Sequence, residues 1–350
     1  MLLGAATPIV LGPFGGVSSV ELTAAVSELG GLGSFGLYGY EPDRIRETIA
    51  EIRARTAKPF AVNVWLEKGD EVTPADVDVH ALTAPLQPFF NELGVDPPAS
   101  PERFLPTSDE QIEAVLDEAP AVLSFVFGVP SPAVVESARD REVQLVGTAT
   151  TVAEALALEA SGVDAIVATG FEAGGHRVSF IADTERSLVG TFSLVPQVVD
   201  AVSVPVIAAG GIADRRGVAA AFALGAQGVQ VGTAFLRTSE SAAAPSYKER
   251  LRGAHPHDTV LTRAMSGRFA RGIPNRAIEE IEASGEIGPF PAQNWITGRF
   301  RAEAARVNNA DLLSLWAGQS AALAKGESAA EVFAELSAGL TPAERLPAAE

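Results

Sequence analysis

Eight short apolar runs, rich in β-branched residues, recur along the first two thirds of the chain and alternate with amphipathic helical patterns. They cover residues 8–14, 32–37, 60–66, 121–128, 144–149, 165–170, 204–211 and 228–235. Runs such as Val-Pro-Val-Ile-Ala-Ala (204–209) are apolar at consecutive positions, which is typical of parallel strands buried on both faces. Eight strands alternating with helices predict an α/β fold, a (β/α)8 TIM barrel, in residues 1–238.

Two segments interrupt this alternation. Residues 67–106 are long, acidic and rich in proline, as expected of a functional loop or a surface excursion. Residues 239–306 follow the eighth strand without a strand pattern, which predicts a small helical subdomain covering the active-site face. We expect helices in 307–340 to complete the barrel, with one at 311–323 closing it, and a frayed tail at 341–350.

Composition excludes several classes of function. The 26 basic and 44 acidic side chains give a net charge of −18, which excludes non-specific binding to nucleic acid or to an anionic membrane as the main activity. The chain has no cysteine, so disulfides, thiolate nucleophiles and Cys-ligated metals are excluded. The apolar N-terminus has no basic residue before Arg44, so we expect a buried strand rather than a signal peptide, and a cytoplasmic enzyme.

Glycine-rich segments end the last two predicted strands. Gly210 and Gly211 follow the seventh, and Gly232 and Thr233 follow the eighth. In these barrels a phosphate often binds in the loops after strands seven and eight. Glycines let the backbone approach an anion closely and Thr233 adds a hydroxyl, so these residues predict a phosphate site; tight packing at the barrel rim is the alternative.

Two polar residues lie where barrel enzymes place their catalytic groups. His176 follows the sixth strand in a glycine-rich loop, and an imidazole with its ordinary pKa near 6.5 exchanges protons near neutral pH. Asn63 interrupts an otherwise apolar strand, which is costly unless its side chain is paired. It either ties down a loop or binds a planar cofactor at the barrel mouth.

Other patterns have weaker support. Gly31, Gly33 and Gly36 match a dinucleotide-binding fingerprint, but they follow a helix and enter a strand, so we interpret them as a turn. The groups at 76–80 and at 255–258 have ligand-like spacing, but both lie in insertions and neither has a third partner. We therefore expect no metal.

Six motifs in order resemble the nitronate monooxygenase family, formerly called 2-nitropropane dioxygenases. They are Ser-Phe-Val-Phe-Gly (124–128), Thr-Gly-Phe-Glu-Ala-Gly-Gly-His (169–176), Ala-Gly-Gly-Ile-Ala-Asp (209–214), Gly-Val-Gln-Val-Gly-Thr-Ala-Phe (228–235), Ser-Gly-Arg-Phe-Ala-Arg (266–271) and Trp-Ala-Gly-Gln (316–319). The resemblance covers nearly the whole chain and is closest to the better-known class of the family, class I.

The resemblance implies an FMN cofactor held by strands seven and eight, and His176 as the catalytic residue. The implied flavin contacts are Asn63, Thr169, Gly174, Gly211, Gln230, Val231, Gly232 and Thr233. It also implies that alkyl nitronates, and nitroalkanes, are oxidised by O2 to an aldehyde or ketone and nitrite without consuming a nicotinamide. The implied partners are thus a small-molecule substrate and O2, and the chain would act as a monomer or a homodimer.

Two positions depart from the family pattern. Thr169 stands where the family usually has Gln, and Gly12-Pro13-Phe14 replaces the usual Ala-Pro-Met. Both departures bear on the substrate more than on the cofactor. Two alternative functions stay open: an NAD(P)H-dependent flavin reductase of the same barrel family acting on quinones or enoyl thioesters, and a flavin-binding protein with little turnover.

Overall fold

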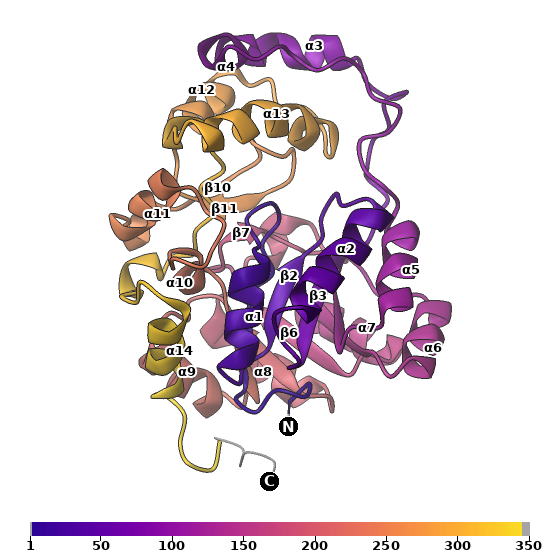
Figure 1. Cartoon of the computed structure of the whole chain (residues 1–350), viewed down its shortest axis with the longest axis vertical. Helices are drawn as coiled ribbons and strands as arrows, with labels where there is room; N and C mark the ends of the chain where they lie inside the picture. Colours follow the sequence, from indigo (N-terminus) through magenta and orange to yellow (C-terminus); the bar gives the residue numbers. More distant parts are fainter. Residues whose placement is uncertain (1, 345–350) are drawn as a thin grey trace.

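The computed structural model describes residues 2–344, and within them eight parallel strands form one barrel (Figure 1). In spatial order they are β1 (Ile9–Leu11), β9 (Gly228–Val231), β8 (Val206–Ala209), β6 (Ala165–Thr169), β5 (Gln144–Ala149), β4 (Val122–Val126), β3 (Phe60–Trp65) and β2 (Gly33–Gly36). A parallel bridge between Val10 and Leu32 brings the two edges together. The predicted (β/α)8 barrel is confirmed, and each predicted strand run contains one of these strands.

Helices surround the barrel and begin at polar caps. They are α1 (Val20–Glu28), α2 (Pro42–Arg53), α5 (Ser108–Glu118), α6 (Pro132–Asp140), α7 (Val152–Ser161), α8 (Thr191–Ala201), α9 (Arg215–Ala223) and α14 (Ala329–Ser337). Ser19, Thr151 and Asp214 accept backbone N–H groups in the first turns of α1, α7 and α9. The final helix α14 packs against α1 and α9 and completes the ring.

Side chains alternate between two apolar cores along the strands. Those facing the helices join the large core around the barrel, whereas Ala61, Val122, Val146, Val167 and Ile207 fill its interior. Because the side-chain period of a strand is two, the register places a polar layer above this interior packing. Asn63, Ser124, Thr148, Thr169 and Gln230 belong to that layer, near the carboxyl ends of the strands.

A second body, which we call the cap, lies over the carboxyl ends of the strands (Figure 1). It comprises the helices α11 (Pro245–Arg252), α12 (Arg276–Ser284) and α13 (Ala292–Arg306), and the strands β10 (Val260–Thr262) and β11 (Ala270–Gly272); the short α10 (Thr233–Leu236) connects β9 to it. The two strands were not expected in residues 239–306. They form because β11 pairs on one side with β10 and on the other with β7 (Gly175–His176), a partner that is distant in sequence.

The expected helix at 311–323 is absent from the described residues. Two short 3-10 turns, Ala310–Leu312 and Ala321–Leu323, flank an extended segment instead. Its backbone pairs with the carboxyl end of β11. Ile273 N donates to Leu315 O at 2.8 Å, and Trp316 forms a bridge with Gly272. This pairing satisfies backbone groups that a helix would have paired internally. The expected frayed tail lies outside the described residues from position 345 onward.

The insertion after β3 belongs to the cap. It forms α3 (Val79–Thr83), a 3-10 turn Ala84–Leu86 and α4 (Gln87–Leu93), which lie against α12 and α13 at the end of the molecule far from β3 (Figure 1). Phe89 and Phe90 are buried there, with ring centroids 5.3 and 5.6 Å from that of Phe300. The cap is therefore built from two separate parts of the sequence around one apolar core.

Candidate active site

The polar layer presents unpaired hydrogen-bonding atoms to the barrel mouth. Asn63 Nδ2 donates to Ser124 Oγ at 2.9 Å on the neighbouring strand, which leaves Asn63 Oδ1 without a partner among residues 2–344. In the same described part of the chain, the side chains of Thr148, Thr169 and Gln230 make no hydrogen bond to another residue. None of these atoms is enclosed by the described residues, so they are available to bond a polar ligand at the mouth.

Gly211, after β8, and Gly232, after β9, leave free space beside this layer, which we call the hollow. A Cβ built on Gly232 would contact only Phe14 Cε1, at 3.4 Å, and one on Gly211 would come no closer than 3.7 Å to Glu172. Gly210 and Gly211 also have positive φ angles of 93° and 76°. Gly211 and Gly232 thus leave room beside the backbone, which fits the close approach of a phosphate group, whereas a Cβ on Gly210 would lie 2.9 Å from Gly170 O.

The cap closes one side of this hollow. Gly318 N donates to Thr233 Oγ1 at 3.0 Å, and Ser320 Oγ donates to Gly211 O at 2.7 Å. The hydroxyl of Thr233 therefore already accepts one bond from the cap and keeps its hydrogen available for a ligand. The two predicted phosphate segments and the cap segment 318–320 meet at one place.

The loop between β6 and β7 is held rigidly by charged side chains. Arg177 donates to Gly170 O at 2.8 Å and Thr169 O at 3.1 Å, and Arg271 Nε donates to Phe171 O at 2.8 Å. Glu172 accepts the backbone N–H of Thr191 at the start of α8. The loop that carries His176 is therefore fixed to the barrel and to the cap at several points.

His176 lies in an aromatic enclosure at the barrel mouth. Its ring centroid is 4.8 Å from that of Trp65 and 5.5 Å from that of Trp316, both in edge-on contact. Its Nε2 is 2.8 Å from Ser266 Oγ. Desolvation by burial, together with the charges of Arg268 and Arg301, lowers the pKa of His176 to about 3. The imidazole is therefore neutral at pH 7, unlike an imidazole with its ordinary pKa, which is partly protonated near neutrality.

Two guanidinium groups lie near the mouth, and only one of them is paired with carboxylates. Arg268 lies over the Phe290 ring, 3.9 Å from its centroid, and pairs with Asp70 and Glu71 of the insertion. Arg301 is half-buried and donates to Ser314 Oγ at 2.8 Å and Asn294 Oδ1 at 2.7 Å. Among residues 2–344 it has no carboxylate partner, so its positive charge stays uncompensated.

Tyr38 extends this arrangement. Its hydroxyl accepts a 3.0 Å hydrogen bond from Asn294 Nδ2, and its ring centroid is 4.3 Å from that of Trp65. Burial raises the pKa of Tyr38, so the phenol stays protonated. Tyr38, Trp65, Phe290 and Arg301 were missed from the sequence. Trp316 and Arg268 lie in quoted motifs, yet no chemical pattern marked them, because their neighbours are distant in sequence.

The structure places most of the expected flavin contacts around one mouth. Asn63, Thr169 and Gln230 belong to the interior layer, and Gly211, Gly232 and Thr233 line the hollow. Two others have a different environment. The Val231 side chain packs into the outer core, so only its backbone could contact a ligand in the barrel. A Cβ on Gly174 would lie 2.6 Å from Gly318 N, so close packing against the cap requires this glycine.

The two segments with ligand-like spacing form capped turns. Asp258 accepts the backbone N–H of His255, and Asp76 accepts that of Thr73. No cluster of three His, Cys, Asp or Glu side chains suited to a metal ion occurs in the described residues.

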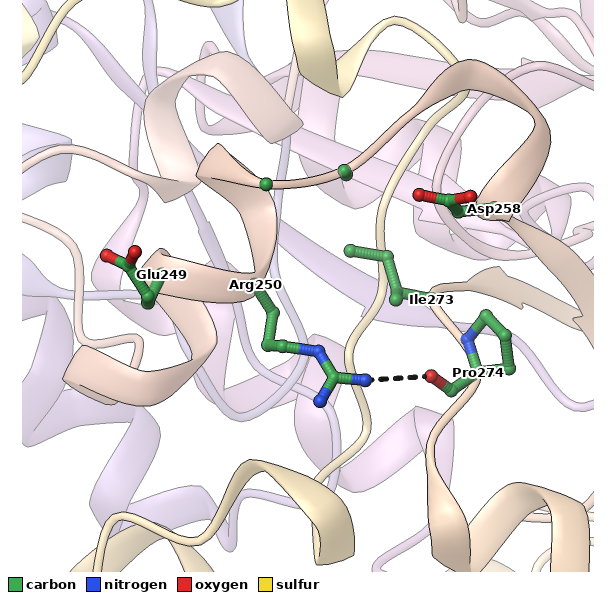
Figure 2. A pocket seen from close by; sticks show the side chains of 7 residues that line it. Glu249, Arg250, Asp258, Ile273 and Pro274 are labelled. Carbon is green, nitrogen blue, oxygen red and sulfur yellow. Dashed lines mark hydrogen bonds between the residues drawn. The ribbon is translucent and has the colours of Figure 1, made fainter.

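A surface pocket of about 320 Å³ in the cap is bordered by α11, where Arg250 points to the carbonyl oxygen of Pro274 (Figure 2). None of the barrel-mouth residues lines it.

The sequence profile of the nitronate monooxygenase family matches residues 2–339. The chain belongs to this family. Probable nitronate monooxygenases from Staphylococcus saprophyticus and Staphylococcus aureus strain MSSA476 are 39% and 40% identical to it. The alignments cover 94% and 91% of this chain, and 93% and 89% of those proteins. The resemblance inferred from six motifs is thereby confirmed, and this member of the nitronate monooxygenase family is an oxidoreductase.

Solved structures agree with this assignment. A nitroalkane oxidase from Streptomyces ansochromogenes has a TM-score of 0.84 and 36% identity, over 97% of this chain and 98% of that one. FabK from Thermotoga maritima has a TM-score of 0.73 and 31% identity, over 96% and 93% of the two chains. None of the helices in residues 2–344 of this nitronate monooxygenase family member is long and apolar enough to cross a membrane.

Proposed function

We propose that this protein oxidises alkyl nitronates with O2 to an aldehyde or ketone and nitrite, using FMN. The observation that carries the proposal is the neutral His176 beside the uncompensated charge of Arg301 at the barrel mouth. A nitronate is an anion, so a guanidinium group without a carboxylate partner favours it over a neutral compound of the same shape.

The mouth fits FMN. Gly211 and Gly232 leave the backbone exposed where a phosphate would bind, and Thr233 keeps a hydroxyl hydrogen to donate. Asn63 Oδ1 and the side chains of Thr169 and Gln230 supply unpaired polar atoms for the edge of a planar ring. When bound, FMN supplies the redox chemistry, because none of the side chains at the mouth can accept electrons reversibly.

The chain's own residues bind and orient the substrate. Arg301 attracts the anion and is held in place by Asn294 and Ser314. Trp65, Trp316 and Phe290 exclude water, which strengthens the electrostatic attraction in the enclosed space. The neutral His176 adds no second positive charge that would need a counter-ion.

Anaerobic absorbance spectra test the reaction class. We expect heat-released cofactor to be FMN, and we expect the bound flavin to be reduced promptly by a primary alkyl nitronate but slowly by NADH. Faster reduction by NADH, with turnover of a quinone or an enoyl thioester, would assign a reductase instead. A yellow protein inert to all of these would be a flavin-binding protein.

Substitution of Arg301 tests the charge argument. Arg301→Met keeps the length of the side chain without its charge, and we expect at least a tenfold loss of kcat/KM for a nitronate. For the corresponding neutral nitroalkane we expect KM to change less than threefold, because that substrate carries no charge until its proton is removed. Arg299→Met is the matched control, since Arg299 is exposed on the same helix and stacks on Trp295. An equal rise in KM for both substrates would contradict the proposed role.

A further inference from the structure

Ser266 is fully buried and holds its one hydroxyl hydrogen in a defined place. Its Oγ donates to Arg268 O at 2.9 Å and accepts from Arg268 N at 3.3 Å. A carbonyl oxygen can only accept, so the hydrogen of this hydroxyl is used by the Arg268 carbonyl. The alternative direction would place two oxygen lone pairs 2.9 Å apart and leave a carbonyl in the buried turn without a donor, which is unfavourable.

The hydrogen bond between His176 and Ser266 can then have only one donor. The distance of 2.8 Å between Nε2 and Oγ is that of a hydrogen bond, and the serine hydrogen is already used. Nε2 must therefore be the donor. The ring is neutral at pH 7 and carries a single N–H, so Nδ1 is bare.

The bare nitrogen is open to a ligand. Nδ1 makes no hydrogen bond to any of residues 2–344, and it is not among the enclosed polar atoms that lack a partner. Nδ1 is therefore not sealed within the described part of the protein. His176 itself is held on β7 by pairing with Ala270, and its ring is wedged between Trp65 and Trp316.

We propose that Ser266 is a positioning residue that fixes His176 as the Nε2–H tautomer and leaves Nδ1 as the nitrogen that accepts a proton from the substrate. The tautomer follows from the hydrogen bonds, whereas the catalytic consequence rests on the proposed function. With a neutral nitroalkane, the C–H bond breaks and the proton goes to Nδ1. The electron pair of that bond forms the C=N bond of the nitronate, and the N=O π pair moves onto a nitro oxygen, which takes the negative charge.

Nitrogen NMR of the holoprotein tests the tautomer directly. The chain has only four histidines, so ¹⁵N-histidine labelling gives four ring systems, and the signals missing from His176→Gln identify this ring. At pH 7 we expect a protonated Nε2 and an unprotonated Nδ1, unchanged down to pH 5. A protonated Nδ1, or a ring averaged between tautomers, would overturn the proposal whatever the enzyme's activity.

Variants of Ser266 test the positioning role. In Ser266→Ala we expect the two ring nitrogens to average toward each other, with kcat for a neutral nitroalkane falling at least tenfold and KM little changed. A nitronate needs no proton removed, so its kcat should fall less than threefold. Ser266→Thr keeps the hydroxyl and should restore the wild-type nitrogen shifts; the exposed Ser284→Ala is the control.

The outcomes separate the two proposals. An unchanged tautomer in Ser266→Ala would overturn the positioning role, and so would equal losses on both substrates. If the wild-type ring shows the expected nitrogen shifts but neither substrate is turned over, the assignment of the tautomer stands and the proposed function fails.

Discussion

At the scale of single residues, His176 shows how strongly its neighbours change a side chain. A histidine in this loop suggests an imidazole that exchanges protons near pH 7. Burial and the charges of Arg268 and Arg301 instead lower its pKa, so the ring stays uncharged well below pH 7. Such a residue remains uncharged in the folded state where the unfolded chain would bind a proton. The environment that keeps the ring neutral therefore costs stability in acid.

This cost gives a prediction for His176. Its folded pKa is depressed to about 3, so the unfolded state binds more protons between pH 6.5 and 3, and stability is lost as the pH falls through this window. From pH 7.0 to 5.5, we expect the wild-type free energy of unfolding to fall about 1 kcal/mol more than that of His176→Gln. Urea unfolding at the two pH values measures it. The exposed His80→Gln is the control, and identical pH dependence in His176→Gln would contradict the prediction.

At the scale of elements, the ends of β6, β8 and β9 use glycine for two different reasons. A Cβ on Gly170 would lie 2.0 Å from Thr191 Oγ1, so packing between the loop and α8 forbids any side chain. At Gly232 the same atom would stand in the open hollow. One glycine serves the fold and the other leaves room for a ligand.

These two glycines respond differently to substitution. We expect Gly232→Val to lose most of the bound flavin while its thermal midpoint without added FMN stays within a few degrees of flavin-free wild type, because the side chain occupies only the hollow. Gly170→Ala should instead lower the free energy of unfolding by about 2–3 kcal/mol through overpacking. Absorbance at the flavin band and thermal unfolding measure both. A fully yellow Gly232→Val would place the phosphate elsewhere.

At the scale of the whole molecule, the cap is a second apolar core that shares the mouth with the barrel. Arg268 joins the two parts of the cap through Asp70 and Glu71 while lying against Phe127 at the end of β4. The mouth is therefore formed above the strands by residues that are far apart in the sequence, namely 38, 65, 176, 266–268, 290–301 and 316. The site exists only when the cap is docked.

The integrity of the cap can be tested at Phe90. Phe90→Ala removes a fully buried ring that packs on Phe300, and we expect it to destabilise the cap by about 3–5 kcal/mol. Urea unfolding followed by tryptophan fluorescence should then show the cap, which contains Trp295 and Trp316, unfolding before the barrel. Phe192→Ala is the control, because this ring is 75% exposed, and its effect should stay within about 0.5 kcal/mol. A single unshifted transition in Phe90→Ala would show that the cap does not depend on this ring.

The sequence by itself determined the barrel, the capped helices and the place of the glycine segments and His176 at the carboxyl ends of the strands. These follow from hydrophobic periodicity and local capping, which act between residues that are neighbours along the chain. Tertiary structure decided the rest. The strands β10 and β11, the extended segment around Trp316 and the joining of residues 79–93 to the cap all depend on pairing between distant segments. The protonation state of His176 was likewise settled only by folding, because burial and the charges of Arg268 and Arg301 reach it through space and not along the chain.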